Sequence, residues 1–303
     1  MSPKVSIIVL NWNGYRDTVE CVNSLGKVAY SNCEIVIVDN GSTDGSEEIL
    51  RKSFPDIKII QTGRNLGFTG GNNVGIRHAL TNGADYVILL NNDTIVDRAF
   101  AGELVKAAET DKSIGLFCSK IYFYDRPDVF WYAGASFHPW LGWGRHRGFN
   151  KRDVGQYDRI EGTERPTGCA LMATRELCEK IGLLREEYFC YCEDLDWGMR
   201  ARDAGYKIVY VPASKVWHKV SRSTGGGSTG ISLYYYTRNM LKCLDENKPL
   251  PFPLRQARYC TFLAAALLGL FTQDLPKGIG VSQIWGGASD YFQGRFGELK
   301  KNS

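Results

Sequence analysis

The chain has 303 residues, with 37 Lys and Arg against 33 Asp and Glu, which gives a formal net charge of +4. Hydrophobic residues make up 44% and charged residues 23%, an ordinary globular composition that excludes disordered, collagenous and disulfide-scaffold proteins. The length suits one large domain, or one domain with an appendage. The small positive excess, without a stripe of basic and aromatic residues, argues against a nucleic acid partner.

The nine cysteines form no C-x-x-C motif, and their odd number leaves at least one unpaired. We therefore expect reduced thiols and a cytoplasmic location. The longest apolar stretch, 259–271, is well short of the roughly 20 residues that span a bilayer, so we expect no transmembrane helix.

Short apolar runs alternate with helical patterns in the first third of the chain. The runs cover 5–10, 34–39, 57–60 and 86–90, and between the first two, Val19, Val22 and Leu25 share one helical face. Strands that are buried on both faces and separated by helices predict βαβ units and a mostly parallel sheet. The sequence therefore predicts an α/β fold, whose ligands bind at the carboxyl ends of the strands.

Further helices are indicated by caps and breakers. Asp44 and Glu47 have the spacing of a capping box, and Pro55 closes the helix that they begin. A helix over 71–80 follows the third strand. The patterns beyond it predict helices over 174–181 and 193–205, and a strand over 207–211 that Pro212 ends.

Polar residues follow three of the predicted strands, at 11–14, 39–42 and 91–94. The carboxyl ends of parallel strands meet at one edge of a sheet, so these segments are expected to lie together. Asn, Asp, Gly and Ser also fill strand-to-helix loops for purely conformational reasons, and for any single loop that explanation weighs at least as much.

Asp93 is the carboxylate at the end of the fourth strand, beside Asn91 and Asn92. Mg²⁺ commonly binds through one or two carboxylates and substrate phosphates, so one Asp suffices if a diphosphate completes the shell. His218 could add a nitrogen ligand, which would favour Mn²⁺. A lone histidine is, however, more often structural than a metal ligand.

A second acidic group, Glu193, Asp194 and Asp196, begins a predicted helix. Acidic residues stabilise a helix N-terminus, and Asp196 with Arg200 has i,i+4 spacing, so part of this group is scaffold. An apolar environment raises the pKa of a carboxyl toward the range of a general base. We assign Asp196 to structure and Asp194 to chemistry.

These motifs together resemble the inverting glycosyltransferases of the large GT-A family 2, particularly its rhamnosyltransferase branch for cell-surface polysaccharides. The resemblance runs from residue 4 to about 240. It is carried by the segments 5–13, 38–45, 65–75, 91–93, 167–168, 193–196 and 235–239, together with His218. Each motif is weak alone, but their order and spacing agree throughout.

The resemblance implies a role for each motif. Asp39 would bind the N3–H of uracil or thymine, Asp93 and His218 would hold Mg²⁺ or Mn²⁺, and Asp194, with Glu193 beside it, would accept the acceptor's proton. Asn65, Gly67, Phe68 and Asn73 would form a loop around the nucleotide, and Arg64 and Arg222 would contact phosphates. The remaining donor-binding candidates are Asn11, Asn13, Asn91 and Asn92. Asn91 replaces the first Asp of the D-x-D motif of many relatives.

The implied reaction transfers a sugar, with inversion, from a nucleotide-diphosphate donor to a glycan or lipid-linked acceptor. The branch favours dTDP-L-rhamnose, and UDP-hexoses or UDP-N-acetylhexosamines remain alternatives. A non-catalytic binding relative is a second class, which the retained Asp39, Asp93, Asp194 and His218 argue against. A nucleotidyltransferase or nicotinamide oxidoreductase would place a glycine-rich loop after the first strand, which this chain lacks.

The resemblance also implies a Rossmann-like GT-A sheet flanked by helices, with a helical C-terminal extension. We expect a catalytic domain over 1–225, with a donor half over 1–120 and an acceptor half over 121–225. Its aromatic segment 122–165 is either an acceptor wall or a satellite core. In the helical region 226–303, the apolar segment 259–271 lies either on the inner face of the cell membrane, or against the catalytic domain or a dimer partner.

Overall fold

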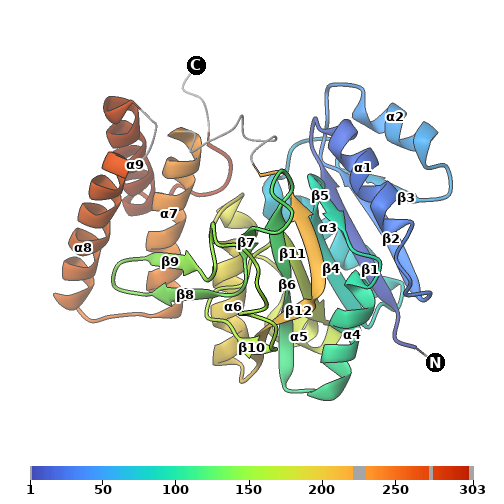
Figure 1. The fold of residues 1–303 in the computed structure, drawn as a ribbon. Helices are drawn as coiled ribbons and strands as arrows, with labels where there is room; N and C mark the ends of the chain where they lie inside the picture. Colours follow the sequence, from blue (N-terminus) through green and yellow to red (C-terminus); the bar gives the residue numbers. More distant parts are fainter. Residues whose placement is uncertain (1, 221–229, 273–275, 300–303) are drawn as a thin grey trace.

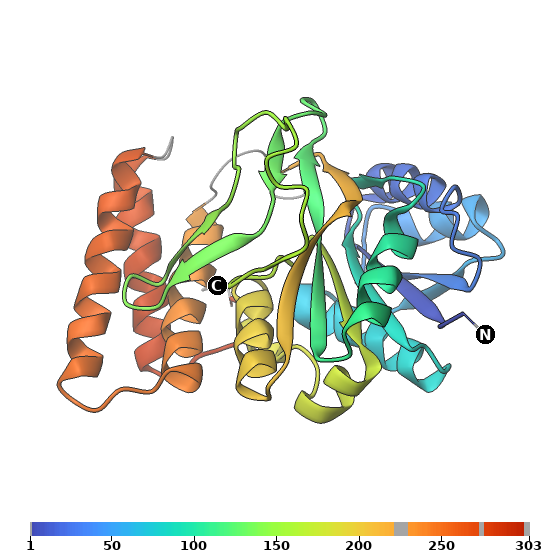
Figure 2. The same cartoon turned by 60° about the horizontal axis from the view of Figure 1, so that its bottom comes forward.

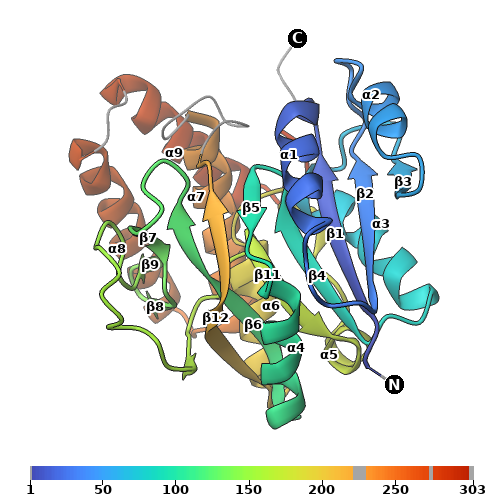
Figure 3. The same ribbon diagram turned by 45° about the vertical axis from the view of Figure 1, so that its right-hand side comes forward.

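The structure is a computed structural model that describes residues 2–220, 230–272 and 276–299. A central sheet has the strand order β10-β12-β6-β11-β4-β1-β2-β3, with β5 paired to β12 and β7 paired to β6. Helices α1 and α4 lie on one face of this sheet and α3 and α6 on the other, and three further helices stand to one side (Figures 1 and 3). The predicted α/β class, with a mostly parallel sheet and C-terminal helices, is confirmed.

The N-terminal part is a run of βαβ units. Its elements are β1 (Val5–Asn11), α1 (Tyr15–Leu25), β2 (Cys33–Asp39), α2 (Ser46–Ser53), β3 (Lys58–Gln61), α3 (Gly67–Thr81) and β4 (Tyr86–Asn91). All four strands are parallel, and the register sets Asn11 opposite Asp39 and Leu10 opposite Asn91. The predicted convergence of the polar strand ends is therefore confirmed.

The second part of the sheet is mixed. Its elements are β5 (Thr94–Val96), α4 (Phe100–Thr110), β6 (Ile114–Phe123), β7 (Phe130–Tyr132), β10 (Glu161–Gly162), β11 (Ala170–Thr174), α5 (Arg175–Ile181), α6 (Glu193–Asp203) and β12 (Lys207–His218). β11 runs antiparallel between β4 and β6. A separate hairpin, β8 (Ala135–His138) and β9 (Trp143–His146), projects from this part toward the C-terminal helices (Figure 2).

Three local predictions were wrong. Pro212 does not end a strand, because β12 continues to His218 through a register shift between Val211 and Lys215 that accommodates the proline. Asp44 does not form the predicted capping box, because Gly45, with φ at 81°, is the N-cap of α2, although the Asp44 carboxylate accepts from the N–H of Ser46 at 3.0 Å. The helix predicted from residue 71 already begins at Gly67, so most of the expected nucleotide loop is helical.

The C-terminal helices are α7 (Gly230–Asn247), α8 (Leu254–Gly269) and α9 (Lys277–Phe292). They share one apolar cluster with α6, which includes Leu195 and Met199 of α6 and Met240 and Leu244 of α7. The helical extension is thus packed onto the helix that begins with Glu193. Within the described ranges, no helix combines the length and the hydropathy needed to cross a bilayer.

Candidate active site

Asp39 ends β2 and is fully buried. Its Oδ1 accepts a hydrogen bond from the backbone N–H of Ser42 at 2.9 Å, and its Oδ2 is buried with no partner among the residues that the structure describes. A buried acceptor without a donor is costly unless a ligand supplies one. The residue predicted to read a pyrimidine N3–H therefore presents an oxygen that needs such a donor.

The asparagines at the ends of β1 and β4 hold the adjoining loops together. Asn11 donates to the hydroxyl of Ser42 at 3.1 Å and accepts from the hydroxyl of Thr18 at 2.7 Å. Asn13, with φ at 50°, accepts from the N–H of Thr43 at 2.8 Å. Asn92 donates to the hydroxyl of Thr18 at 2.9 Å. These amides therefore shape the edge on which Asp39 lies, in addition to any contact with a donor.

The start of α3 is fitted closely to two other segments. Asn65 accepts from the amide of Asn40 at 3.0 Å and from the N–H of Gly67 at 2.8 Å. A Cβ on Gly67, whose φ is 72°, would lie 2.4 Å from the carbonyl oxygen of Phe189. Only glycine fits this position, because it provides both the backbone angle and the space. The close backbone approach that glycine permits here is therefore made to the chain's own residue Phe189.

Of the other residues predicted to line the nucleotide, Phe68 lies beside Gly168 near the site, whereas Asn73 belongs to the scaffold. The ring of Phe68 packs against Gly168, where an added Cβ would lie 3.0 Å from it. Asn73 is instead committed to Leu184, since it donates to that residue's carbonyl at 2.7 Å and accepts from its N–H at 3.1 Å. Arg64 is exposed beside Gly41, and Arg222 lies outside the described residues.

Asp93 and His218 meet at the carboxyl end of the sheet. The Nε2 of His218 lies 3.2 Å from Oδ1 of Asp93, both side chains are buried, and Nδ1 of His218 has no protein partner. Burial lowers the pKa of His218, but Cys169 and Asp93 outweigh it and raise the pKa to about 10. β5 brings the two residues together, because it follows Asp93 and pairs Thr94 with His218.

This pair fits a divalent cation. It combines a carboxylate with an imidazole nitrogen that faces it, and such ligands suit Mg²⁺ or Mn²⁺ when phosphates complete the shell and the cation replaces the proton that the raised pKa leaves on His218. Across the described part of the chain, no group of three or more His, Cys, Asp and Glu side chains gathers to hold a metal.

Glu193 and Asp194 begin α6 in different environments. Glu193 is buried and its Oε2 has no partner, and burial together with the neighbouring Asp194 raises its pKa from 4.5 to about 8. Asp194 is half-buried and accepts from the N–H of Gly168 at 3.1 Å. Of the two carboxyls, Asp194 is the one that an incoming molecule can reach.

Asp196, the residue assigned to structure, is indeed a scaffold residue. It is fully buried and lies 3.0 Å from Arg185 and 2.8 Å from Arg200 in two ion pairs, and it also accepts from the amide of Asn247 at 2.8 Å. A carboxylate that is fully paired in this way is not available to a substrate.

A short backbone path joins the end of β4, which precedes Asp93, to Asp194. Gly168, which donates to Asp194, precedes Cys169, whose carbonyl accepts from the N–H of Asn91 at 2.9 Å. β11 then runs antiparallel to β4. The segment 167–169 therefore fixes the start of α6 relative to the end of β4, and both ends face the same edge of the sheet.

The loop before α6 has an unusual backbone that α7 holds in place. Phe189, Tyr191 and Cys192 have φ angles of 63°, 66° and 70°, a region that large side chains rarely adopt. Asn239 donates to the carbonyls of Tyr188, Cys190 and Tyr191 at 2.8, 2.7 and 2.9 Å. Arg238 donates to the carbonyl of Tyr188 at 3.1 Å.

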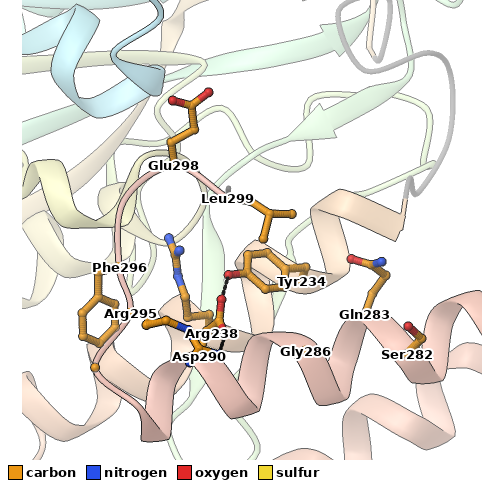
Figure 4. Close-up of a pocket in the computed structure, with 11 residues that line it drawn as sticks. Tyr234, Arg238, Ser282, Gln283, Gly286, Asp290, Arg295, Phe296, Glu298 and Leu299 are labelled. Atoms are coloured by element: carbon orange, nitrogen blue, oxygen red, sulfur yellow. Dashed lines mark hydrogen bonds and ion pairs between the residues drawn. The ribbon is translucent and has the colours of Figure 1, made fainter. Parts of the chain in front are cut away.

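Arg238 also closes one side of a polar pocket of about 840 Å³ between α7, α9 and the C-terminal segment (Figure 4). Its Nη1 donates to the carbonyl of Gly297 at 2.8 Å. Across the pocket, Asp290 of α9 pairs with Arg295 and accepts from Tyr234. Because Arg238 bonds with backbone and Asp290 with Arg295, we assign this pocket to the support of the loop before α6.

Sequence reasoning missed Arg165 and His146, which lie beside Tyr236 of the 235–239 motif and Trp131 of the aromatic segment. Arg165 lies under the ring of Tyr236, 6.0 Å from its centroid, and Tyr236 and Asp194 raise its pKa although burial opposes them. Trp131 lies between two histidines, at 4.9 Å from His218 and 4.7 Å from His146. Burial, with Arg165, lowers the pKa of His146 to about 4. Arg165 comes from an irregular segment and His146 from the β8–β9 hairpin, and the pairing of such segments carries no sequence signal.

Comparison with known proteins agrees with this geometry. Residues 6–182 match the model of "Glycosyl transferase family 2", which is more than half of the chain. The chain belongs to glycosyl transferase family 2. This membership shows a transferase enzyme and confirms the resemblance drawn from the sequence.

Two relatives of this family 2 chain have rhamnosyltransferase names. The N-acetylglucosaminyl-diphospho-decaprenol L-rhamnosyltransferase of Mycobacterium tuberculosis is 30% identical over 215 residues, which cover 63% of this chain and 68% of the relative. The dTDP-rhamnosyl transferase RfbF of Shigella flexneri is 24% identical over 260 residues, 80% of this chain and 81% of the relative. The rhamnosyltransferase-like branch is thereby supported.

A solved structure resembles the whole family 2 fold. The mannosyltransferase PcManGT from Pyrobaculum calidifontis, in complex with GDP-Man and Mn²⁺, superimposes with a TM-score of 0.63 at 16% identity. The match covers 97% of this chain and 88% of that one, so it includes the C-terminal helices. At this identity the likeness shows the shared GT-A fold.

Proposed function

We propose that this enzyme transfers a sugar, with inversion, from a nucleotide-diphosphate donor to a hydroxyl of a glycan or lipid-linked acceptor. One observation carries the proposal: three chemically different groups, each able to accept a proton donor or a cation, lie along one edge of the sheet. They are the unpartnered Oδ2 of Asp39, the pair of Asp93 and His218, and the accessible carboxylate of Asp194. They suit, in that order, a base, a diphosphate with its cation, and an acceptor hydroxyl.

At the donor end, Asp39 accepts the N3–H of a uracil or thymine, a pairing that an acceptor-only carboxylate favours. Asn65, Gly67 and Phe68 shape the adjoining wall, while Asn11, Asn13 and Asn92 hold its loops. Asp93 and His218 hold the divalent cation, with Asn91 next to them. The cation supplies positive charge that stabilises the departing nucleoside diphosphate.

At the acceptor end, Asp194 takes the proton of the attacking hydroxyl. The backbone N–H of Gly168 orients its carboxylate at 3.1 Å. Glu193 remains protonated around neutral pH because its pKa is raised to about 8, so two adjacent negative charges are avoided. Asp194 raises the pKa of Arg165, whose guanidinium lies over the ring of Tyr236, and we place the acceptor beside these two residues.

The relatives favour dTDP-L-rhamnose as the donor, and UDP-hexoses or UDP-N-acetylhexosamines are the alternative. The relative from Mycobacterium tuberculosis bears a name that specifies a diphospho-decaprenol acceptor. We extend this class to the present chain as a lipid-linked glycan acceptor. The enzyme would then work in the cytoplasm at the inner face of the cell membrane.

A donor hydrolysis panel tests the proposal. Purified enzyme with Mn²⁺ or Mg²⁺ is given dTDP-rhamnose, UDP-glucose, UDP-galactose and UDP-N-acetylglucosamine, and released nucleoside diphosphate is measured. We expect release from one donor, abolished by EDTA. With that donor and an acceptor, Asp194→Asn should remove transfer while dTDP or UDP still binds. Silence on all donors, with no thermal shift by dTDP or UDP, would contradict the proposal.

A further inference from the structure

An apolar groove runs between the β8–β9 hairpin and helices α7 and α8, a region where the hairpin crosses these helices (Figures 1 and 2). Its volume is about 640 Å³, within the usual range of roughly 300–1,000 Å³ for ligand pockets. Aromatic and aliphatic side chains form most of its surface. They include Trp143 of the hairpin, Tyr191, Leu233 and Tyr236, and Phe262, Ala265, Ala266 and Leu268 of α8.

The inner end of the groove adjoins the candidate active site. Tyr191, which lines it, precedes Glu193 by two positions. Tyr236 lines it as well, and its hydroxyl donates to the carbonyl of Gly142 at 2.7 Å. The guanidinium of Arg165 lies over this tyrosine ring, 6.0 Å from its centroid. A Cβ on Gly144, another lining residue, would lie 3.0 Å from the Arg165 side chain.

Three chemically different parts of the molecule therefore follow one another along this path. The carboxylate of Asp194 comes first, the cation of Arg165 second, and the apolar groove third. A molecule that follows this path would carry a hydroxyl, then a negative charge, then a hydrocarbon chain. This is the arrangement of a glycan that is joined to a lipid through phosphate.

The outer end of the groove leaves large apolar side chains in contact with solvent. Trp143 is 60% exposed and Leu268 is 67% exposed. Phe271, just beyond α8, is 76% exposed. Exposed apolar side chains that continue a groove are typical of a surface that binds an apolar partner. A chain longer than the groove would cover them as it leaves.

Other occupants fit less well. The segment 221–229, which precedes α7, reads Ser-Arg-Ser-Thr-Gly-Gly-Gly-Ser-Thr and contains no apolar side chain. It could not fill a groove of this lining. A phosphate at the inner end would gain an ion pair with Arg165.

We propose that this groove binds the hydrocarbon chain of a phosphate-linked acceptor, with the phosphate beside Arg165 and the sugar at Asp194. The inference rests on the proposed glycosyl transfer and specifies how its acceptor is recognised. It also assigns a function to the β8–β9 hairpin and α8, which hold the acceptor chain.

Farnesyl diphosphate is a suitable probe, because it joins one hydrocarbon chain to a phosphate group without a sugar. Its binding to the full chain is measured by calorimetry, with farnesol and inorganic diphosphate as the separate halves. Ala266→Trp fills the groove, and Ala264→Trp, on an exposed position of the same helix, is the matched control. We expect Ala266→Trp to weaken farnesyl diphosphate binding at least tenfold and Ala264→Trp to leave it unchanged.

Comparison of farnesyl diphosphate with its separate halves, and of the variants with the wild type, tests the proposal. Farnesol should bind more weakly than farnesyl diphosphate, and Arg165→Gln should remove this difference. Absence of farnesyl diphosphate binding, or equal loss in both tryptophan variants, would overturn the groove proposal. Donor hydrolysis by the same preparation separates the two proposals. Hydrolysis without farnesyl diphosphate binding refutes the groove alone, and groove-dependent binding without hydrolysis of any donor refutes the proposed transfer alone.

Discussion

The side-chain amide of Asn239 donates a hydrogen bond to the carbonyl of Tyr191 at 2.9 Å, and it also reaches the carbonyls of Tyr188 and Cys190. These bonds tie α7 to the loop from which Glu193 and Asp194 emerge. The loop contains residues at positive φ, which cost free energy and persist only where the surroundings hold them. The C-terminal helices therefore support the active site directly.

Asn239→Ala should impair both stability and activity. The buried amide would leave three backbone carbonyls without this donor, so we expect a loss of about 1–3 kcal/mol in the free energy of unfolding. Displacement of Asp194 should also lower kcat by about tenfold or more, since small misplacements of a reacting group are costly. Urea unfolding and steady-state kinetics measure the two effects.

The control is Asn23→Ala, on an exposed position of α1, which should change the unfolding free energy by about 0.5 kcal/mol or less. If Asn239→Ala destabilised the protein but left kcat at the wild-type value, the role of the amide in placing Asp194 would be refuted.

Gly67→Ala should be more damaging than a similar change nearby. Gly63 and Gly67 both have positive φ, at 76° and 72°, but an added Cβ meets nothing at Gly63 and lies 2.4 Å from the Phe189 carbonyl at Gly67. Gly63→Ala should therefore cost only the left-handed backbone, about 1–2 kcal/mol. Gly67→Ala should cost more in urea unfolding and weaken nucleotide binding, and equal costs would contradict the importance of the close approach.

The sheet and its binding edge were predictable because the relevant signals are local. Apolar runs such as 5–10 and 86–90 mark buried strands, and a parallel sheet then brings Asp39 and Asp93 to one edge. Long-range contacts gave no such signal. Arg165 lies near Asp194 from an irregular segment, and Asn239 of α7 bonds with residues of the loop before α6 that lie 48 to 51 positions earlier. Pro212 led to a wrongly predicted strand end, because a bulge in β12 accommodates the proline and the strand continues.

Asp39→Asn should weaken and broaden nucleotide binding. The amide can present a donor where the carboxylate accepts, so we expect the affinity for UDP or dTDP to fall about ten- to a hundredfold, as for loss of a charged hydrogen bond. The preference for UDP or dTDP over GDP should fall as well. Asp44→Asn removes the same charge from an exposed position of the same loop and should leave calorimetric affinities unchanged. Preserved pyrimidine preference in Asp39→Asn would refute the base contact.

Glu193→Gln should alter the pH dependence of stability. Burial and Asp194 raise the pKa of Glu193 from 4.5 to about 8, so between these values the folded protein binds a proton that the unfolded chain has lost. This contribution to stability is full below about pH 4.5 and is lost as pH rises through 8. The variant should therefore show a smaller decline in unfolding free energy over that range, whereas exposed Glu176→Gln should follow the wild type.

Asp93→Asn should remove the stabilisation that Mn²⁺ gives in the presence of UDP or dTDP. Asp93 and His218 are the only proposed protein ligands, and loss of the carboxylate leaves a neutral amide that binds hard cations poorly. A ligand that binds only the folded protein raises its melting temperature, so we expect a Mn²⁺-dependent shift in the wild type and little or none in the variant. Asp125→Asn, with a side chain that is 78% exposed, removes the same charge elsewhere and should keep the shift. An undiminished shift in Asp93→Asn would place the cation at other residues.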